Sequence, residues 1–216
     1  MEFQKVLETR RSVRKYDPNV SVTREQMEEL IRAAQEAPSW KNSQTGRYYC
    51  VLSEEIVNKI RENCLPGARN AEKSEHAALI VTTFVHNRAG FQTDGTPDNE
   101  LGNGWGCYDL GLQNANLILK ATDLGLSTLI MGLREADKLR EILSIPETET
   151  IAAVIAVGKA AEEGRRKEHG KGNLHDVQNL DNNGGVHLGG NEGAAQKSKD
   201  GHGHGAPGIH VGVMVV

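Results

Sequence analysis

Apolar residues occur along the first 160 positions in two patterns, and each pattern predicts one kind of element. The spacing of three and four residues predicts a short helix around Phe3, Val6 and Leu7. A second helix begins at a capping box, Thr23 with Gln26, and is ended by Pro38. The same spacing predicts further helices over residues 54–64, 108–124 and 139–143.

Continuous apolar runs rich in Val, Ile and Thr mark the strands. These runs lie at residues 47–52, 77–85, 127–131 and 151–157. Strands that alternate with helices favour an α/β arrangement on pattern alone.

Residues 87–106 show neither the helical spacing nor a continuous apolar run. The segment holds five glycines and one proline, so we predict a long loop that roofs a pocket. Its aromatic residues, Phe91 and Trp105, predict that parts of the loop fold back onto the body. The run Leu101–Gly106 fits neither a Walker pattern nor a Rossmann fingerprint, because no βαβ unit surrounds it.

The C-terminal part has a different composition. No aromatic residue follows Tyr108, and six of the eight histidines and half of the 24 glycines lie beyond residue 168. Such a segment buries too little apolar surface to offset its ordering entropy, so residues 168–216 are predicted to form a disordered tail. Residues 209–216 alone could form a strand. Residues 1–167 then form the single folded domain.

Charge and hydropathy narrow the function classes. The net charge of -4 gives no reason to expect a nucleic-acid partner. No apolar run approaches the ~20 residues of a membrane span, and Met1–Lys5 starts no secretory leader. The three cysteines, Cys50, Cys64 and Cys107, are expected to be reduced, buried thiols. We therefore expect a soluble, cytoplasmic protein.

A cluster of cations between the first helix and Pro18 is the first chemical signal. Arg10, Arg11, Ser12 and Arg14 stand with Lys15 and no acid among them. Arginine offers forked donors and serine a short hydroxyl donor, which together suit a phosphate group. A solvated basic patch remains the alternative on chemistry alone.

This cluster and three later motifs, in this order, resemble the nitroreductase family of FMN-dependent NAD(P)H oxidoreductases. The later motifs are Ala37–Gln44, the helix from Asp109 with Gln113-Asn114 that runs into Gly125–Gly132, and the strand from Thr150 to Val157 followed by Gly158. The resemblance covers roughly residues 1–167.

The resemblance changes the expected fold to a three-layer α+β arrangement. It implies a mixed sheet flanked by helices, with the long central helix at the interface of a homodimer whose flavin sites lie between the subunits. It implies FMN as cofactor and NADH or NADPH as co-substrate. The implied reaction reduces nitroaromatics, quinones or similar electron-poor small molecules by a ping-pong mechanism, in which the flavin carries the chemistry and no protein side chain is catalytic.

The resemblance also assigns site residues by position. Arg10, Arg11, Ser12 and Arg14 resemble the segment that holds the FMN phosphate and the polar edge of the ring. Pro38, Ser39, Trp40 and Asn42 resemble the segment that the partner subunit contributes. The strand end that lies against the ring and the basic run that helps hold the phosphate correspond to Leu129, Ile130, Met131, Gly132, Arg165 and Arg166.

The chain departs from the family pattern in its C-terminal tail, which leaves other functions open. A flavin-binding protein with little or no turnover is one alternative. A reductive dehalogenase or dehydrogenase on the same scaffold is another. A third is weak metal binding by the tail histidines His187, His202, His204 and His210.

Overall fold

The computed structural model describes residues 1–161 and 213–215. Arg165, Arg166, the tail histidines and the predicted disorder of residues 168–212 lie outside the described residues. In the described part of the tail, Val213–Val215 forms a strand, as the apolar run predicted.

Four antiparallel strands form the centre of the sheet: β1 (Gly46–Val51), β2 (Ala78–Val85), β3 (Ser127–Met131) and β4 (Glu149–Gly158). Their order is β3-β4-β2-β1, and β5 (Val213–Val215) adds to β1 in the parallel sense. With β5 included, the sheet is mixed, as predicted. β3 occupies one edge, and β4 pairs on both of its sides.

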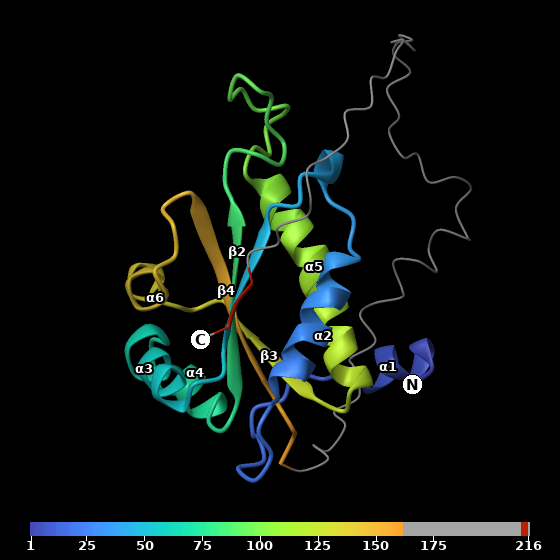
Figure 1. The fold of residues 1–216 in the computed structure, drawn as a ribbon, viewed down its shortest axis with the longest axis vertical. Coiled ribbons are helices and arrows are strands. Elements are labelled where there is room, and N and C mark those ends of the chain that lie inside the picture. The colour runs from blue at the N-terminus through green and yellow to red at the C-terminus, as the bar shows by residue number, and fades with distance from the viewer. Residues whose placement is uncertain (162–212, 216) are drawn as a thin grey trace, which may run out of the picture. The chain divides into compact units, whose positions relative to one another are not determined.

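Helices cover both faces of this sheet (Figure 1). Apolar residues of α2 (Arg24–Gln35) and α5 (Gly104–Asp123) form one core with one face. Those of α3 (Glu54–Cys64) and α6 (Ala136–Leu143) form a second core with the other face. The described chain is therefore α+β in three layers. The remaining helices are α1 (Phe3–Thr9), the single 3-10 turn η1 (Trp40–Asn42) and α4 (Ala68–Lys73).

The sequence signals for helix α2 are confirmed in detail. Thr23 Oγ1 accepts from the Gln26 backbone N–H at 3.2 Å, and the Gln26 side chain accepts from the Thr23 N–H at 3.0 Å. This reciprocal capping satisfies two donors that the first turn of a helix leaves free.

The start of α5 corrects the predicted loop. The helix begins at Gly104 rather than near Tyr108, so the loop ends at Asn103, three residues before the predicted end at Gly106. Gly106 lies against β2, where an added Cβ would come within 2.5 Å of Phe84 Cδ2. This glycine permits close packing of a helix on a strand, which sequence composition alone cannot distinguish from loop flexibility.

The prediction of buried cysteines holds for two of the three. Cys50 and Cys64 are buried, whereas Cys107 is exposed on the first turn of α5. Burial raises the pKa of the Cys50 thiol to about 12, which keeps it protonated and inert. Tyr108, the next residue, is also exposed, so apolar or aromatic neighbours in the sequence did not indicate which side of the helix Cys107 occupies.

Candidate functional site

The cation cluster lies along the outer edge of strand β3. Ser12 forms an isolated parallel bridge with Thr128, and the Val13 N–H donates to the Thr128 carbonyl at 3.0 Å. This pairing places residues 10–14 beside the strand that carries the second group of predicted site residues, 129–132. The structure thus brings together two segments that are more than 100 positions apart.

Along β3, the backbone N–H and C=O groups of successive residues point alternately toward β4 and toward the outer edge. Because the Thr128 carbonyl points outward, the backbone groups of Ile130, two residues on, point outward as well. The Ile130 side chain is 49% exposed, whereas Leu129 and Met131 are buried in the core on the α3 and α6 face. Leu129 and Met131 therefore hold the strand in place, and the accessible surface comes from Ile130 and the residues after Met131.

Gly132 leaves the edge open. An added Cβ at this position would meet no atom within 4 Å, so the described chain gives no packing reason for a glycine here. Its carbonyl accepts from Arg134 Nη1 at 3.2 Å, and the Arg134 guanidinium also donates to the Ile151 carbonyl at 2.5 Å. Arg134 thereby ties the end of β3 to β4, a role that the sequence pattern did not indicate.

The cations at this edge are oriented by backbone carbonyls. Arg11 Nη1 donates to the Arg10 carbonyl at 2.6 Å, and Arg14 Nη1 donates to the Ser12 carbonyl at 3.2 Å. Within the described residues, no carboxylate lies within ion-pair distance of Arg10, Arg11 or Arg14. Their positive charges are therefore held together and not neutralised, which suits an anionic ligand.

The other predicted segment forms a tight turn after helix α2. Pro38 is exposed at its start, and the Ser39 Oγ accepts from the Gln44 N–H at 3.1 Å. The Trp40 N–H donates to Asp109 Oδ2 at 2.8 Å, and Asn42 is exposed at the tip. Asp109 on α5 is a contact that sequence reasoning missed, because it joins residues 69 positions apart.

The loop between β2 and α5 packs against this turn. Asp98 of the loop pairs with Lys41 at 3.1 Å. Trp105, in the first turn of α5, packs against Trp40 with ring centroids 4.3 Å apart. A reciprocal pair of hydrogen bonds between Asn87 and Asn103 closes the base of the loop. Trp105 does fold back onto the body, as predicted. The loop covers the turn and does not line the cavity described below.

One chain does not bring the two halves of the predicted site together. The turn contacts α5 at Asp109, near its N-terminal end, whereas Met1, which precedes α1, contacts Asp123 at the other end. Figure 1 shows α1 beside the C-terminal end of α5. The stretch of α5 between these contacts is about 20 Å long at 1.5 Å per residue. The cation cluster lies beside the strand that follows the distal end, so the turn and the cluster lie at opposite ends of α5.

Buried polar atoms without partners gather at these same segments. Within the described residues there are six such atoms. Five lie in or within a few residues of the cation cluster, the turn or the end of β3: Arg11 Nε, Trp40 Nε1, Ser43 Oγ, Thr45 Oγ1 and Arg134 Nε. Unpaired buried groups are uncommon in folded proteins and often await water or a ligand. These are groups that a bound water or ligand could satisfy at the cation cluster and at the turn.

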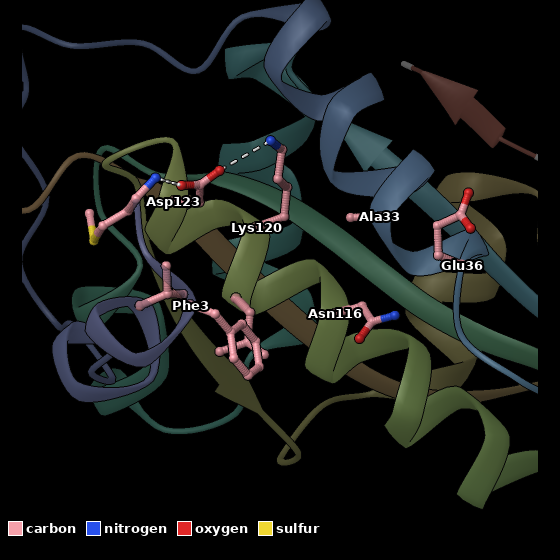
Figure 2. A pocket seen from close by; sticks show the side chains of 9 residues that line it. Phe3, Ala33, Glu36, Asn116, Lys120 and Asp123 are labelled. Atoms are coloured by element: carbon pink, nitrogen blue, oxygen red, sulfur yellow. Dashed lines mark hydrogen bonds and ion pairs between the residues drawn. The ribbon is translucent and has the colours of Figure 1, made fainter.

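A cavity of about 340 Å³ lies elsewhere, between helices α1, α2 and α5. Figure 2 shows Phe3, Ala33 and Asn116 facing this cavity from the three helices. At one end, Asp123 joins the Met1 amino group at 2.6 Å and Lys120 Nζ at 3.3 Å. None of the predicted site residues lines the cavity.

Residues 1–161 and 213–215 contain neither a cluster of metal ligands nor a membrane-spanning helix. No group of three or more His, Cys, Asp or Glu side chains in this part of the chain could hold a metal ion. Likewise, none of its helices has the length and hydropathy needed to cross a membrane.

Comparison with known proteins connects this arrangement to a family. The pattern of the Nitroreductase family matches residues 7–159. YdgI of Bacillus subtilis (strain 168), provisionally named an NAD(P)H nitroreductase, is 24% identical over 191 residues, which cover 76% of this chain and 90% of YdgI. An Archaeoglobus fulgidus protein provisionally named NADH dehydrogenase/NAD(P)H nitroreductase is 28% identical over 171 residues, which cover 75% of this chain and 87% of the relative.

A solved structure gives the same fold. It is a provisionally named nitroreductase from Exiguobacterium sibiricum 255-15 in complex with FMN, with a TM-score of 0.66 and 22% identity. The match covers 82% of this chain and 96% of that one. The chain is thus an oxidoreductase of the NAD(P)H nitroreductase type, and it belongs to the nitroreductase family.

Proposed function

We propose that the protein is an FMN-dependent oxidoreductase that uses NADH or NADPH to reduce nitroaromatics, quinones or similar electron-poor compounds. The observation that carries this proposal is the edge of β3. There the Ser12–Thr128 bridge aligns the cations of residues 10–14 with the exposed Ile130 and the open Gly132. The FMN complex of the Exiguobacterium relative supports the choice of cofactor.

The residues at this edge fit the chemistry of FMN. Arg10, Arg11, Ser12 and Arg14 offer charged and hydroxyl donors to a phosphate, and the Nε of Arg11 is enclosed without a partner. The exposed Ile130 side chain gives an apolar contact for a flat ring, and Gly132 leaves room for close approach. When bound, FMN supplies the redox chemistry, accepting a hydride equivalent from the nicotinamide and passing electrons to the second substrate.

The same proposal includes a homodimer. The turn at residues 38–42 and the cation cluster lie at opposite ends of α5, so one flavin contacts both only if two copies contribute. The α1, α2 and α5 face carries an open cavity and exposed apolar side chains, among them Phe3 at 68% and Met1 at 55%. We place the subunit interface on this face, with α5 at its centre.

The test is the visible absorption spectrum of the purified, FMN-incubated protein before and after anaerobic addition of NADH or NADPH. Flavin bands that bleach with one donor and return with p-benzoquinone or a nitrobenzene would support the proposal and name the donor. Parallel lines in double-reciprocal plots would support the ping-pong order. A protein that retains no FMN after gel filtration would overturn it, and bound FMN that neither donor reduces would favour a flavin-binding protein without turnover.

A further inference from the structure

The turn that follows Pro38 has an unfavourable backbone. Lys41, Asn42 and Gln44 all have positive φ values, of 45°, 54° and 49°. Non-glycine residues rarely occupy this left-handed region, and three within four positions is an unusual concentration. Such a backbone persists only where the surrounding structure determines it.

A small set of contacts holds the turn from the side of α5. Asp109 Oδ2 accepts from the Trp40 N–H at 2.8 Å, directly before the first left-handed residue. Trp105, one turn earlier on the same helix, stacks on the Trp40 ring. Ser39 Oγ closes the turn internally by accepting from the Gln44 N–H.

Asp109 is the unusual member of this set. Its side chain is 2% exposed, and a buried carboxylate is costly unless its hydrogen bonds compensate for lost water. The Trp40 N–H is the one protein donor to its carboxylate within the described residues. The hydrogen bond that this carboxylate accepts comes from the turn and not from α5 itself, so its interaction serves the turn.

We propose that Asp109 is a positioning residue that sets the shape of the turn Ser39–Gln44 for contact with FMN across the subunit interface. The role in flavin binding rests on the proposed function above. The role in shaping the turn can be measured in the protein without flavin. An experiment can therefore refute the role in shaping the turn and the role in flavin binding independently.

The chain provides its own spectroscopic probe. Its two tryptophans are Trp40 and Trp105, which stack with an interplanar angle of 42°. Two indoles this close and tilted are expected to couple. The circular dichroism of the protein without flavin, at wavelengths longer than those that tyrosine absorbs, therefore reports on this tryptophan pair. The FMN dissociation constant, from quenching of flavin fluorescence, reports on the site.

Three variants of the full chain decide the question. Asp109→Ala removes the acceptor, and we expect loss of the coupled tryptophan signal and FMN binding weakened by about tenfold or more. Asp109→Asn keeps an acceptor oxygen of the same shape and should restore both. Leu117→Ala, two turns along α5 and fully buried, controls for lowered stability and should change neither below its unfolding temperature.

The inference is overturned if Asp109→Ala keeps the wild-type tryptophan spectrum and FMN affinity, or if Leu117→Ala loses them equally. Failure of Asp109→Asn to restore either signal would also contradict a hydrogen-bond role. If the wild-type protein binds no FMN, the proposed function falls, while the tryptophan spectra still decide whether Asp109 shapes the turn.

Discussion

At the scale of single residues, the arginines of the cation cluster differ from ordinary surface arginines in what orients them. Backbone carbonyls fix the guanidinium groups of Arg11 and Arg14, whereas Arg24 on α2 pairs with Glu28 at 3.5 Å. A carbonyl directs a guanidinium without cancelling its charge. The cluster therefore keeps its attraction for a phosphate in the folded protein.

Replacing Arg14 with Ala should weaken FMN binding with little effect on hydride transfer in FMN-saturated protein. A hydrogen bond to a charged group contributes about 1.5–3 kcal/mol, which corresponds to a loss of roughly ten- to a hundredfold in affinity. Fluorescence titration of the apoprotein with FMN measures it, and Arg24→Ala, an equal change of charge on α2, is the control. Equal affinity in the wild type and Arg14→Ala would remove Arg14 from the phosphate site.

The buried carboxylate of Asp109 should also give stability a pH dependence. Burial raises the pKa of Asp109 above its ordinary value of 3.8, and the hydrogen bond from Trp40 offsets part of this. A raised pKa means that the folded state binds the proton more tightly than the unfolded chain, so this residue's contribution becomes less favourable as pH rises.

Asp109→Asn removes this titration. The unfolding free energy of the variant, relative to the wild type, should therefore increase from below pH 3.8 toward neutral pH. Urea unfolding at a series of pH values measures the difference. A difference that stays constant across this range would mean that the carboxyl has the same pKa in the folded and unfolded states.

At the scale of elements, two glycines of α5 serve different purposes. Gly106 faces Phe84 of β2 at a separation that excludes a Cβ, whereas Gly111 is exposed and an added Cβ would meet no atom within 4 Å. The first is a packing requirement between helix and sheet. Gly111 has no such packing requirement, and it lowers the stability of the helix because glycine loses more backbone entropy on folding than alanine does.

The two Gly→Ala variants should therefore change stability in opposite directions. Gly106→Ala is expected to destabilise by about 1–3 kcal/mol through overpacking against Phe84. Gly111→Ala should stabilise by up to about 1 kcal/mol, because alanine is the better helix former. Thermal unfolding of the full chain measures both, and a stabilised Gly106→Ala would show that helix and strand separate easily at this point.

How far the sequence alone predicts an element depends on how local its determinants are. Helix α2 was predictable because its cap and its stop, Thr23 and Pro38, lie within the segment itself. The beginning of α5 was not, because Gly106 is explained by Phe84, which comes from β2. The cation cluster was recognisable as a motif, but its place beside Thr128 depends on a bridge between distant segments.

The turn shows the same limit within the site. Ser39, Trp40 and Asn42 were found by resemblance, whereas Asp109 and Trp105, which hold them, appeared only as parts of a helix and a loop. The order of the strands was also beyond pattern analysis, since alternation does not say which strand lies at an edge.

At the scale of the whole molecule, the face formed by α1, α2 and α5 should control both assembly and cofactor retention. Phe3→Asp replaces an exposed apolar side chain beside the cavity with a charged one. We expect the dimer dissociation constant to rise by at least about tenfold, since a buried phenyl group contributes about 1.5–3 kcal/mol. Bound FMN should fall with the dimer fraction.

Sedimentation velocity with detection at flavin wavelengths measures mass and cofactor together. Val20→Asp, at an exposed apolar residue in the loop before α2, is the matched control. A wild-type protein that sediments as a monomer with FMN bound would contradict both the interface and the shared site.

The position of β4 in the sheet has a consequence for how the protein is made. It is the last of the four central strands to leave the ribosome, and both β2 and β3 pair with it. Until Gly158 has emerged, β3 has no strand to pair with and β2 exposes an unpaired apolar edge to solvent, the kind of surface through which nascent chains aggregate. We therefore expect the soluble yield to depend on how quickly translation passes from β3 to the end of β4, and on the chaperones that cover the exposed edge during that interval.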